Sequence, residues 1–431
     1  MTTTAAASTD TATTVWPGIA PRLLKITPGP EDVTAYRSAG GYRPLPAPAE
    51  FLTSVEHSGL LGRGGAAFPL AVKLATVREA ALAGTQTVVV ANGEEGEPAS
   101  IKDRWLLRHR PHLVLDGLRL AAHTVGATRV YVYVSDPAAA HGVEVALGEA
   151  DALDQLTIQI FTVEPGYVAG EETAALRAIN GGPAKPSDKP PRPYQHGVAG
   201  LPTVVSNVET LANLPYIHAH GASEFRALGT AGSPGSFLAT ISGAGRAPVL
   251  YELPYGVQFG ELLELHRVAA DQVRGALMGG YFAGLLNRDV LGATLDHESL
   301  RGMGSGLGCG AIAILTEDCP VAVAASVLAY FDRENAGQCG SCFNGTAAMA
   351  AVATALRDGT ATSEDVARLR RWSVGLRGRG ACGTLDGAAN VAASLLAQFP
   401  DVVQHHLDNE PTVQRTPRVG ARPYAIEELT A

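Results

Sequence analysis

Residues 88–104 read VVVANGEEGEPASIKDR and carry the clearest signal of fold class in the chain. The apolar start is short and β-branched, which is typical of a strand buried on both faces. It runs into an Asn-Gly turn and then into Glu94, Glu95 and Glu97. Ligands of layered α/β proteins bind at the carboxyl ends of such strands. Carboxylates there would accept hydrogen bonds from hydroxyl groups and repel phosphate, and a solvated acidic turn explains them equally well.

Further strand-like runs follow this one. RVYVYVS at 129–135 and LTIQIFTV at 156–163 alternate with helical patterns, as TVVVAN at 87–92 does. Strands separated by helices favour a layered α/β domain with a partly parallel sheet, which we assign to residues 31–230.

The pattern changes twice in the second half of the chain. Short β-rich runs surround one helical segment over residues 231–316, which predicts a small α+β domain. Four helical patterns follow over residues 317–410 and predict a small helical bundle. Residues 1–30 are rich in Thr and Ala and residues 411–431 look extended, so we expect tails at both ends, the first of them disordered.

Composition narrows the class of function. The chain has 431 residues and a net charge of −9, which argues against a nucleic-acid partner. Its apolar runs fall short of the roughly 18–20 residues that span a bilayer, so we expect no membrane insertion. Five cysteines are few and odd in number, which favours free thiols in a reducing cytoplasm over a disulfide framework.

A glycine-rich stretch at 58–73, SGLLGRGGAAFPLAVK, is the first candidate binding loop. Its glycines flank Arg63 and free the backbone to turn tightly and point amides at an anion. A following helix would add its positive N-terminal end, and Lys73 would add a point charge. The stretch suits a nucleotide phosphate, and a plain glycine-rich turn also explains it.

Two later stretches place polar residues at helix starts. PGYVAGEETAALRAINGG at 165–182 puts two carboxylates in a first turn, and GLPTVVSNVETLANLP at 200–215 puts Ser, Asn and Thr at a strand-to-helix junction. Helix capping alone is a sufficient explanation of both.

Residues 334–345, ENAGQCGSCFNG, contain the C-x-x-C pair Cys339 and Cys342. Two thiolates at this spacing can bind a metal, build an iron–sulfur cluster or cycle as a disulfide. Ala336 stands where one more cysteine would complete C-x-x-C-x-x-C.

Taken together and in this order, these stretches resemble one family: the flavin-carrying, NADH-oxidising subunit of respiratory complex I and of related NAD-reducing hydrogenases and formate dehydrogenases. The resemblance rests on G-R-G-G-A-x-F-P-x-x-x-K, N-x-E-E-G-E-P-x-x-x-K-D-R, G-E-E-T and P-T-V-V-x-N-V-E-T-L-A-N. It implies an α/β FMN-binding domain at 31–230, a small β-grasp-like (SLBB-type) α+β domain at 231–316, and a C-terminal four-helix iron–sulfur domain at 317–410.

The resemblance also implies the site residues. FMN would lie against a glycine loop formed by Gly62, Arg63, Gly64, Gly65 and Lys73. Its other contacts would come from Asn92, Glu94, Glu95, Tyr167, Gly170, Glu171, Glu172, Ser206, Asn207 and Thr210. Positions near the nicotinamide nucleotide are Phe68, Glu97 and Lys189. Glu97 and Glu172 are the expected catalytic residues, and hydride transfer from NADH to the flavin is the expected chemistry.

The chain departs from the family at the adenine clamp. The family places one aromatic ring in a Lys-Trp-Ser-Phe string and one in a Pro-Pro-Phe-Pro string. The matching positions here are Thr76 and Arg192, so both rings are absent. Stacking of a base on an aromatic ring contributes roughly 1–3 kcal/mol, so we expect NADH to bind more weakly by about one to two orders of magnitude.

The second departure lies at the cluster. The family's loop reads E-S-C-G-x-C-x-P-C-R-E-G, with a fourth cysteine further on. Cys339, Cys342 and Cys382 match three ligands, and Ala336 replaces the first. Because a [4Fe–4S] cluster normally takes one ligand per iron, the options are an exogenous fourth ligand, a [3Fe–4S] cluster or no assembly. Zinc, a Cys339–Cys342 disulfide and plain packing are the alternatives.

The expected function is therefore an FMN-dependent oxidoreductase subunit that takes hydride from NADH and passes electrons to an iron–sulfur cluster or to a [2Fe–2S] or ferredoxin-like partner. The alternative is a repurposed flavin-binding scaffold with weak or no NADH activity and a different donor or acceptor. The missing clamp and Ala336 favour the scaffold, while the intact glycine and G-E-E-T stretches favour the enzyme.

Overall fold

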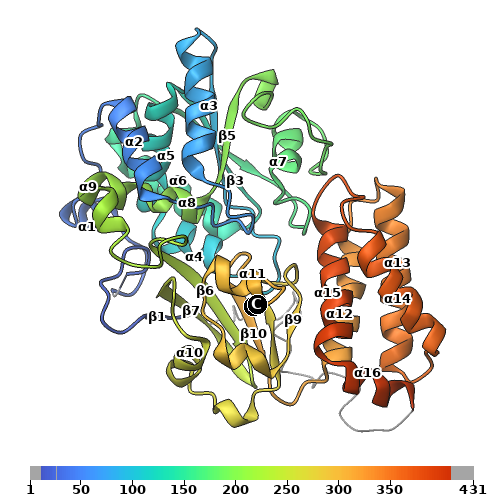
Figure 1. Cartoon of the computed structure of the whole chain (residues 1–431). Coiled ribbons are helices and arrows are strands. Elements are labelled where there is room, and N and C mark those ends of the chain that lie inside the picture. Colours follow the sequence, from blue (N-terminus) through green and yellow to red (C-terminus); the bar gives the residue numbers. More distant parts are fainter. Residues whose placement is uncertain (1–10, 26, 409–431) are drawn as a thin grey trace, which may run out of the picture.

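The computed structural model describes residues 11–25 and 27–408, which form three units. In Figure 1 an α/β unit occupies the upper part, a second sheet lies beneath it, and a helical unit runs along one side. The tail predictions for residues 1–10 and 411–431 lie outside the described residues.

The α/β unit is built on a four-stranded sheet of order β4-β3-β2-β5, in which all neighbouring strands are parallel. Its strands are β2 (Val88–Asn92), β3 (Arg129–Val134), β4 (Thr157–Thr162) and β5 (Thr203–Asn207). Its helices are α1 (Val33–Ser38), α2 (Pro48–Ser58), α3 (Leu70–Leu82), α4 (Lys102–His109), α5 (Pro111–Val125), α6 (Pro137–Glu149), α7 (Glu172–Ile179), α8 (Val208–Ala212) and α9 (Leu214–Phe225). The three predicted strands are confirmed, and the sheet is fully rather than partly parallel.

Helix α5 passes through the interior of this unit, and nearly every one of its residues is buried. It approaches α8 so closely that a Cβ on Gly117 would lie 2.0 Å from the carbonyl oxygen of Leu211. Only glycine permits this contact. Because α8 follows β5 directly, the contact fixes the carboxyl end of β5, where the candidate site lies.

The second unit is a six-stranded sheet of order β1-β7-β6-β10-β8-β9. Its strands are β1 (Ala12–Val15), β6 (Ser236–Gly243), β7 (Arg246–Pro254), β8 (Gly275–Met278), β9 (Leu285–Leu286) and β10 (Ala311–Leu315), with helices α10 (Phe259–His266) and α11 (His297–Gly302). β6 is buried along its whole length because it lies inside the sheet and also faces the α/β unit, where Leu238 and Thr240 contact Glu209 and Ile101.

The prediction that residues 1–30 form a disordered tail is wrong for the part that the structure describes. β1 pairs in parallel with β7. The amides of residues 22–24 then donate to the buried carboxylate of Glu252 at 2.9–3.1 Å. These contacts join distant parts of the chain, so no local periodicity in the N-terminal sequence announces them.

The helical unit contains α12 (Pro320–Glu334), α13 (Gly340–Arg357), α14 (Ser363–Gly375), α15 (Thr384–Gln398) and α16 (Pro400–Leu407). The prediction of four helices is wrong, since the described part of this unit has five. The chain breaks between α15 and α16 because Pro400 has no amide to continue α15 and Phe399 leaves the helical region, with φ −131° and ψ 45°.

Insertion into a bilayer would require a long and apolar helix. No helix among the described residues combines the length and the apolar character that this requires.

Candidate functional site

Strands β2 and β5 bring predicted polar residues to one edge of the parallel sheet. Asn92 at the end of β2 pairs in register with Asn207 at the end of β5, and Ser206 stands beside Ala91. Asn207 also caps α8, because its Oδ1 accepts from the amide of Glu209 at 3.0 Å. The edge therefore carries polar groups from segments that are far apart in sequence.

The glycine loop is fastened to this edge. The amide of Gly62 donates to the carbonyl of Phe68 at 2.9 Å and closes the loop. The amide of Arg63 donates to Oγ1 of Thr210 at 2.8 Å. Thr210 lies on α8, so this residue contributes to the site by holding the loop in place.

The middle of the loop leaves its backbone available. A Cβ on Gly64 would lie 3.4 Å from Cβ of Asn207, so the loop passes close over the end of β5. Gly65 has φ +104°, a conformation that glycine adopts without strain. Within the described part of the chain, the amides of Gly64 and Gly65 donate to no backbone or side-chain acceptor. Two such free amides beside a helix start suit an anion.

The side chain of Arg63 does not take the expected position at the loop surface. It is 4% exposed and reaches into the second unit, where it bonds to the hydroxyl of Tyr255 and, at 3.1 Å, to the carbonyl of Ser236. Its Nε lies 3.9 Å from Oε1 of Glu209. The guanidinium of Arg63 therefore joins two units while its backbone lies in the loop, and the role of Arg63 in binding the cofactor stays a prediction.

Two lysines and two glutamates form a half-buried cluster beside the loop. Lys73 Nζ lies 3.0 Å from Oε2 of Glu172 and donates to the carbonyl of Val205 at 2.9 Å. Lys189 Nζ lies 2.7 Å from Oε1 of Glu171 and 3.1 Å from Oε1 of Glu172. Burial opposes ionisation of Glu172, but the two lysines outweigh it and lower the pKa of this carboxyl. The cluster joins the start of α7 to α3 and to the long loop after α7.

Asn92 and Glu94 present buried polar atoms without a partner. Asn92 Nδ2 donates to the carbonyl of Gly170 at 2.8 Å, while its Oδ1 has no hydrogen bond within the described residues. Glu94 is 5% exposed and its Oε2 is likewise unpaired there. A Cβ on Gly170 would lie 2.5 Å from that same Oε2, so only glycine at this position leaves room for the carboxyl. Orphaned buried groups of this kind mark a place for a polar ligand.

Burial raises the pKa of Glu94 to about 8. Between the usual glutamate pKa near 4.5 and this value, the unfolded chain has released the proton that the folded chain keeps, so stability falls as pH rises. Glu94→Gln removes that loss. We expect the free energy of unfolding of flavin-free Glu94→Gln, taken relative to the native chain, to increase by about 2 kcal/mol or more from pH 5 to pH 8. Urea unfolding at each pH measures it.

The matched control for this measurement is Glu79→Gln on an exposed part of α3. A native chain and a Glu94→Gln variant with parallel stability–pH curves would contradict the buried, protonated carboxyl.

The other two carboxylates of the turn are used within the protein. Glu95 accepts from Oγ of Ser100 at 2.6 Å and from the amides of Asp103 and Arg104 at 3.1 and 3.2 Å, so it caps the start of α4. These bonds fix the position of Glu95, and the flavin contact that the resemblance implies for it stays a prediction. Glu97 accepts from the amide of Tyr281 at 3.0 Å and ties the turn to the second unit, and burial raises the pKa of Glu97 to about 8.

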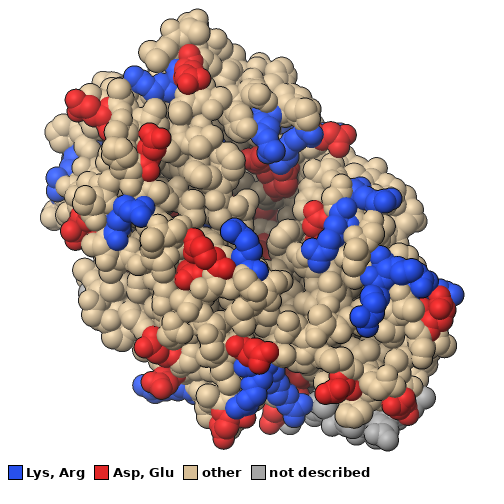
Figure 2. All heavy atoms as spheres, viewed as in Figure 1, with Lys and Arg blue, Asp and Glu red and all other residues tan. Residues whose placement is uncertain are grey.

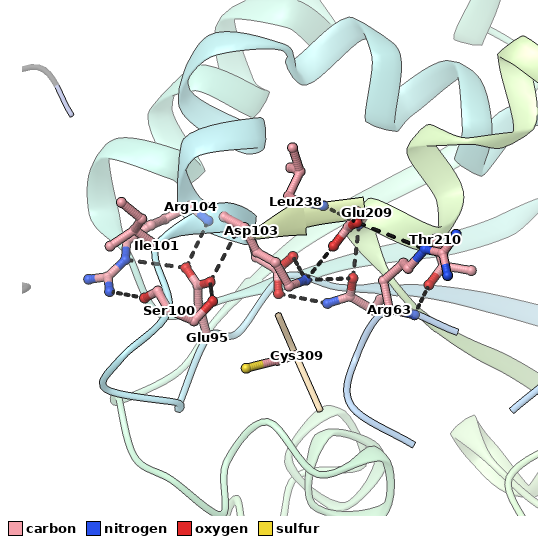
Figure 3. A network of polar contacts seen from close by, with 12 residues as sticks. Arg63, Glu95, Ser100, Ile101, Asp103, Arg104, Glu209, Thr210, Leu238 and Cys309 are labelled. Carbon is pink, nitrogen blue, oxygen red and sulfur yellow. Dashed lines mark hydrogen bonds and ion pairs between the residues drawn. The ribbon is translucent and has the colours of Figure 1, made fainter. Parts of the chain in front are cut away.

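Lys102 belongs to the site, although the sequence-based prediction omitted it. It is 1% exposed, and its Nζ lies 2.7 Å from Asp103 Oδ1, 2.9 Å from Glu209 Oε2 and 3.3 Å from Asn207 Oδ1. Burial favours the neutral amine, but Asp103 and Glu209 outweigh it and raise the pKa of Lys102. Figure 3 shows Asp103, Glu209 and Arg63 converging on this buried region under the end of β5. The K-D-R part of the motif was the signal that could have identified it.

Tyr167 lies where the α/β unit meets the helical unit. Its ring packs edge-on against Tyr330 and Phe331 of α12, with centroids 5.8 and 5.2 Å away. Burial, and then the negative charge of Glu97, raise the pKa of Tyr167 well above its usual value. The hydroxyl of Tyr167 is therefore neutral and lies between the helical unit and the turn that carries Glu94, Glu95 and Glu97.

The positions of the missing adenine clamp lie at the surface. Thr76 is half-buried on α3, with its hydroxyl bonded to the carbonyl of Val72 at 3.0 Å, and Arg192 is exposed. Phe68 is 37% exposed, and its ring centroid lies 5.8 Å from Lys73 Nζ. One aromatic face is therefore present beside the ionic cluster, at a predicted nucleotide position.

The three predicted metal ligands converge on the start of α13. Cys339 is the N-cap of α13, Cys342 lies in its first turn, and Cys382 lies just before α15. The Sγ of Cys339 accepts from the amide of Ala381 at 3.5 Å. Burial, followed by the nearby Cys382 and Cys339, raises the pKa of Cys342 to about 12. Across the described residues, no group of three or more His, Cys, Asp or Glu side chains is arranged to hold a metal ion.

The loop before Cys339 docks on the α/β unit. Lys185 Nζ donates to the carbonyl of Ala336 at 2.8 Å. Gln338 accepts from Arg177 at 2.7 Å and donates to the carbonyl of Pro186 at 2.8 Å. The position of the absent cysteine is thus held against the segment that follows α7. Figure 2 shows this face of the molecule hollowed near its centre, with acidic side chains inside the hollow and basic ones at its edge.

Comparisons with known proteins agree with this arrangement. Residues 55–216 match the family model described as the Nuo51 FMN-binding domain, and residues 322–406 match the NADH-ubiquinone oxidoreductase-F iron-sulfur binding region. The second NADH-quinone oxidoreductase F subunit of Rhizobium meliloti (strain 1021) is 33% identical over 413 residues, which are 90% of this chain and 98% of the relative. The HndC subunit of the NADP-reducing hydrogenase of Solidesulfovibrio fructosivorans is 32% identical over 88% of this chain and 82% of its own length.

A solved structure is also similar. The air-oxidized NAD+-reducing [NiFe]-hydrogenase contains a chain that superimposes with a TM-score of 0.78 at 32% identity, over 84% of this chain. This chain spans 63% of that hydrogenase chain. The two family models and the 33% identity over nearly the whole length of the Rhizobium relative lead to one conclusion: the chain belongs to the family of NADH-quinone oxidoreductase F subunits.

Proposed function

We propose that this chain oxidises NADH at a bound FMN and passes the electrons onward through an iron–sulfur site. The observation that carries the proposal is the pair of buried, unpaired oxygens, Asn92 Oδ1 and Glu94 Oε2, at the carboxyl end of β2. They lie at the sheet edge where the glycine loop leaves two amides free. A ligand with a phosphate at one end and polar ring atoms at the other fits both features.

The donor set fits FMN. The amides of Gly64 and Gly65 and the charge of Lys73 would hold the phosphate. Asn92 and Glu94 would bind the polar edge of the flavin or its ribityl hydroxyls. Because the pKa of Glu94 is raised to about 8, its carboxyl is largely protonated at neutral pH and would donate a hydrogen bond rather than accept one. When bound, FMN would supply the redox chemistry, namely acceptance of a hydride and release of single electrons, while these residues hold and orient it.

The nucleotide would lie on the open side of the ionic cluster. Lys189 offers a positive charge to a pyrophosphate, and the exposed ring of Phe68 offers a stacking face. Glu97, held through the amide of Tyr281, would close the nicotinamide end. These residues bind and orient the donor, and the ion pairs of Glu171 and Glu172 keep both carboxylates from repelling it.

The three thiols lie near one another without being arranged to hold a metal ion in this structure, and a cluster bound by them would be one protein ligand short. Cys339, Cys342 and Cys382 lie around the start of α13, and Ala336 stands in the place of the fourth ligand. We further propose that the second sheet is the β-grasp-like unit of the family and that the chain works with an iron–sulfur partner subunit. The support for a partner is that its relatives are named as subunits of an oxidoreductase and of a hydrogenase.

Anaerobic titration of purified FMN-loaded protein with NADH, followed by bleaching of the flavin, tests the function. The same titration of Thr76→Trp tests the nucleotide site. A tryptophan at Thr76 would restore one face of the adenine clamp and should lower the concentration of NADH needed for half bleaching of the flavin by about tenfold or more. Glu79→Trp, one turn further along α3, is the matched control and should leave that concentration unchanged.

A second candidate function is favoured by the same surface. With Thr76 and Arg192 at the clamp, the flavin site can serve a different electron donor. If millimolar NADH and NADPH bleach the flavin in neither the native chain nor Thr76→Trp, the dehydrogenase function is rejected. The repurposed flavin-binding scaffold is then the remaining candidate.

A further inference from the structure

The cysteine site is bordered by a surface of opposite sign to the chain as a whole. The sequence has a net charge of −9. Residues 363–382 nevertheless contain five arginines, all exposed, against two acidic residues: Arg368, Arg370, Arg371, Arg377 and Arg379, with Glu364 and Asp365. Figure 2 shows basic side chains gathered over the part of the surface that α13 and α14 occupy in Figure 1.

Only part of this charge is neutralised within the protein. Arg368 and Arg371 form ion pairs with Glu364, and Arg368 also pairs with Asp365. Arg377 donates only to the carbonyl of Ser373, at 3.0 Å. The other two, Arg370 and Arg379, have no ion pair within the described residues. Solvated cations without internal partners remain available to a second molecule.

One of these arginines, Arg379, is joined to the cysteine loop through its backbone. The carbonyl of Arg379 accepts from the hydroxyl of Ser341, which lies between Cys339 and Cys342. The amide of Ala381, two residues further on, donates to the Sγ of Cys339 at 3.5 Å. On the opposite side of the loop, Lys185 and Arg177 bond to its backbone and to Gln338. Cations therefore flank the cysteine site on both sides.

Apolar side chains complete this surface. Val374 is 70% exposed at the end of α14, and Phe343 is 41% exposed directly after Cys342. Phe282 is 38% exposed and covers Gly383, where a Cβ would lie 3.0 Å from its ring. Exposed apolar residues rimmed by charge are typical of protein interaction sites.

Acidic side chains are also present nearby and set the limits of the patch. Glu334 pairs with Arg333, Asp386 accepts from the amide of Gly378, and Asp188 is exposed on the loop after α7. The first two are engaged within the protein. The excess of positive charge therefore lies on the α14 side, at Arg370, Arg377 and Arg379.

We propose that this cationic, partly apolar surface around Cys339, Cys342 and Cys382 is the docking site of a small acidic electron-carrier protein that takes one electron at a time. The inference rests on the proposed function, because it makes this surface the exit for electrons that NADH supplies. Oxidation of one NADH to NAD+ releases two electrons and one proton, so two carrier molecules are reduced for each NADH. Opposite charges at such a contact raise the association rate and make binding depend on salt.

The test uses FMN-loaded full-length protein, a purified acidic [2Fe–2S] ferredoxin as probe, and biolayer interferometry over a series of salt concentrations. Arg377→Glu/Arg379→Glu should weaken binding by about tenfold or more at low salt and flatten its salt dependence. The control Arg246→Glu/Arg274→Glu carries the same change of charge on exposed positions of the second sheet and should change binding less than about twofold. Bleaching of the flavin by NADH is measured on every variant and should not change.

Several results would overturn the docking site. Equal affinity of the two double variants for the ferredoxin would do so. Basic cytochrome c that binds the native chain as tightly as the ferredoxin would also do so. Phosphatidylserine-containing vesicles serve as a further probe. If they bind as tightly as the ferredoxin and Arg377→Glu/Arg379→Glu weakens both, the patch is a membrane-binding surface instead. The two proposals can fail separately. If NADH does not bleach the flavin but the ferredoxin still binds in a way that depends on Arg377 and Arg379, the proposed function is rejected and the docking site is retained.

Discussion

Lys102→Met should destabilise the protein by about 3–5 kcal/mol, because it removes the ammonium that contacts two buried carboxylates and leaves only the longer contact of Arg63 with one of them. Asp103 and Glu209 are 4% and 1% exposed, so neither regains water when the ammonium is lost. Urea unfolding of the flavin-free chain measures the loss. The retention of FMN should fall as well, since Lys102 also contacts Asn207 at 3.3 Å, next to the glycine loop.

A double-mutant cycle separates this charge effect from simple loss of packing. Lys102→Met/Glu209→Gln removes one of the two carboxylate charges and should recover part of the lost stability. Lys185→Met, which replaces an exposed lysine, should cost less than about 1 kcal/mol. Equal losses in the Lys102 single and double variants would show that the buried ion pairs do not hold the sheet edge together.

Ala336→Cys should add about one iron per chain after anaerobic reconstitution with iron and sulfide, because it supplies a thiolate at the corner that the three native cysteines leave open. The position is well fixed: the carbonyl of Ala336 is held by Lys185 at 2.8 Å, and Asn335 Oδ1 accepts from the amide of Gly337 at 2.9 Å. Iron and sulfide analysis, with low-temperature electron paramagnetic resonance of the oxidised protein, measures the change. Signals of a three-iron cluster should disappear.

Ala361→Cys is the control, since it adds a thiol to the helical unit on the turn before α14, outside the cysteine loop. Iron absent from both the native chain and Ala336→Cys, or zinc in place of iron in both, would rule out the iron–sulfur interpretation of the three cysteines; four irons in both would point to an exogenous fourth ligand in the native chain.

Much of the architecture could be predicted because the signals are local. The apolar runs of β2, β3 and β4 and the helix start at Glu171 depend on neighbours within a few residues. The prediction was wrong where a contact came from far away. β1 is held by its pairing with β7, which lies far along the chain. The break before α16, at Phe399 and Pro400, was by contrast a local signal that the prediction missed.

For the site, the order of the motifs by itself suggested, through the resemblance, that Asn92, Ser206 and Asn207 share one binding site, and the register of β2 and β5 then puts Asn92 beside Asn207. The sequence also determined that three cysteines and Ala336 share one loop system. Only the tertiary structure decided the direction of each charged side chain. Arg63 and Lys102 turn inward, and Glu95 caps α4, because buried charges take whichever partners the assembled units present. Arg63 finds Tyr255 and Ser236 in the second unit, and Lys102 adds the distant Glu209 and Asn207 to its neighbour Asp103.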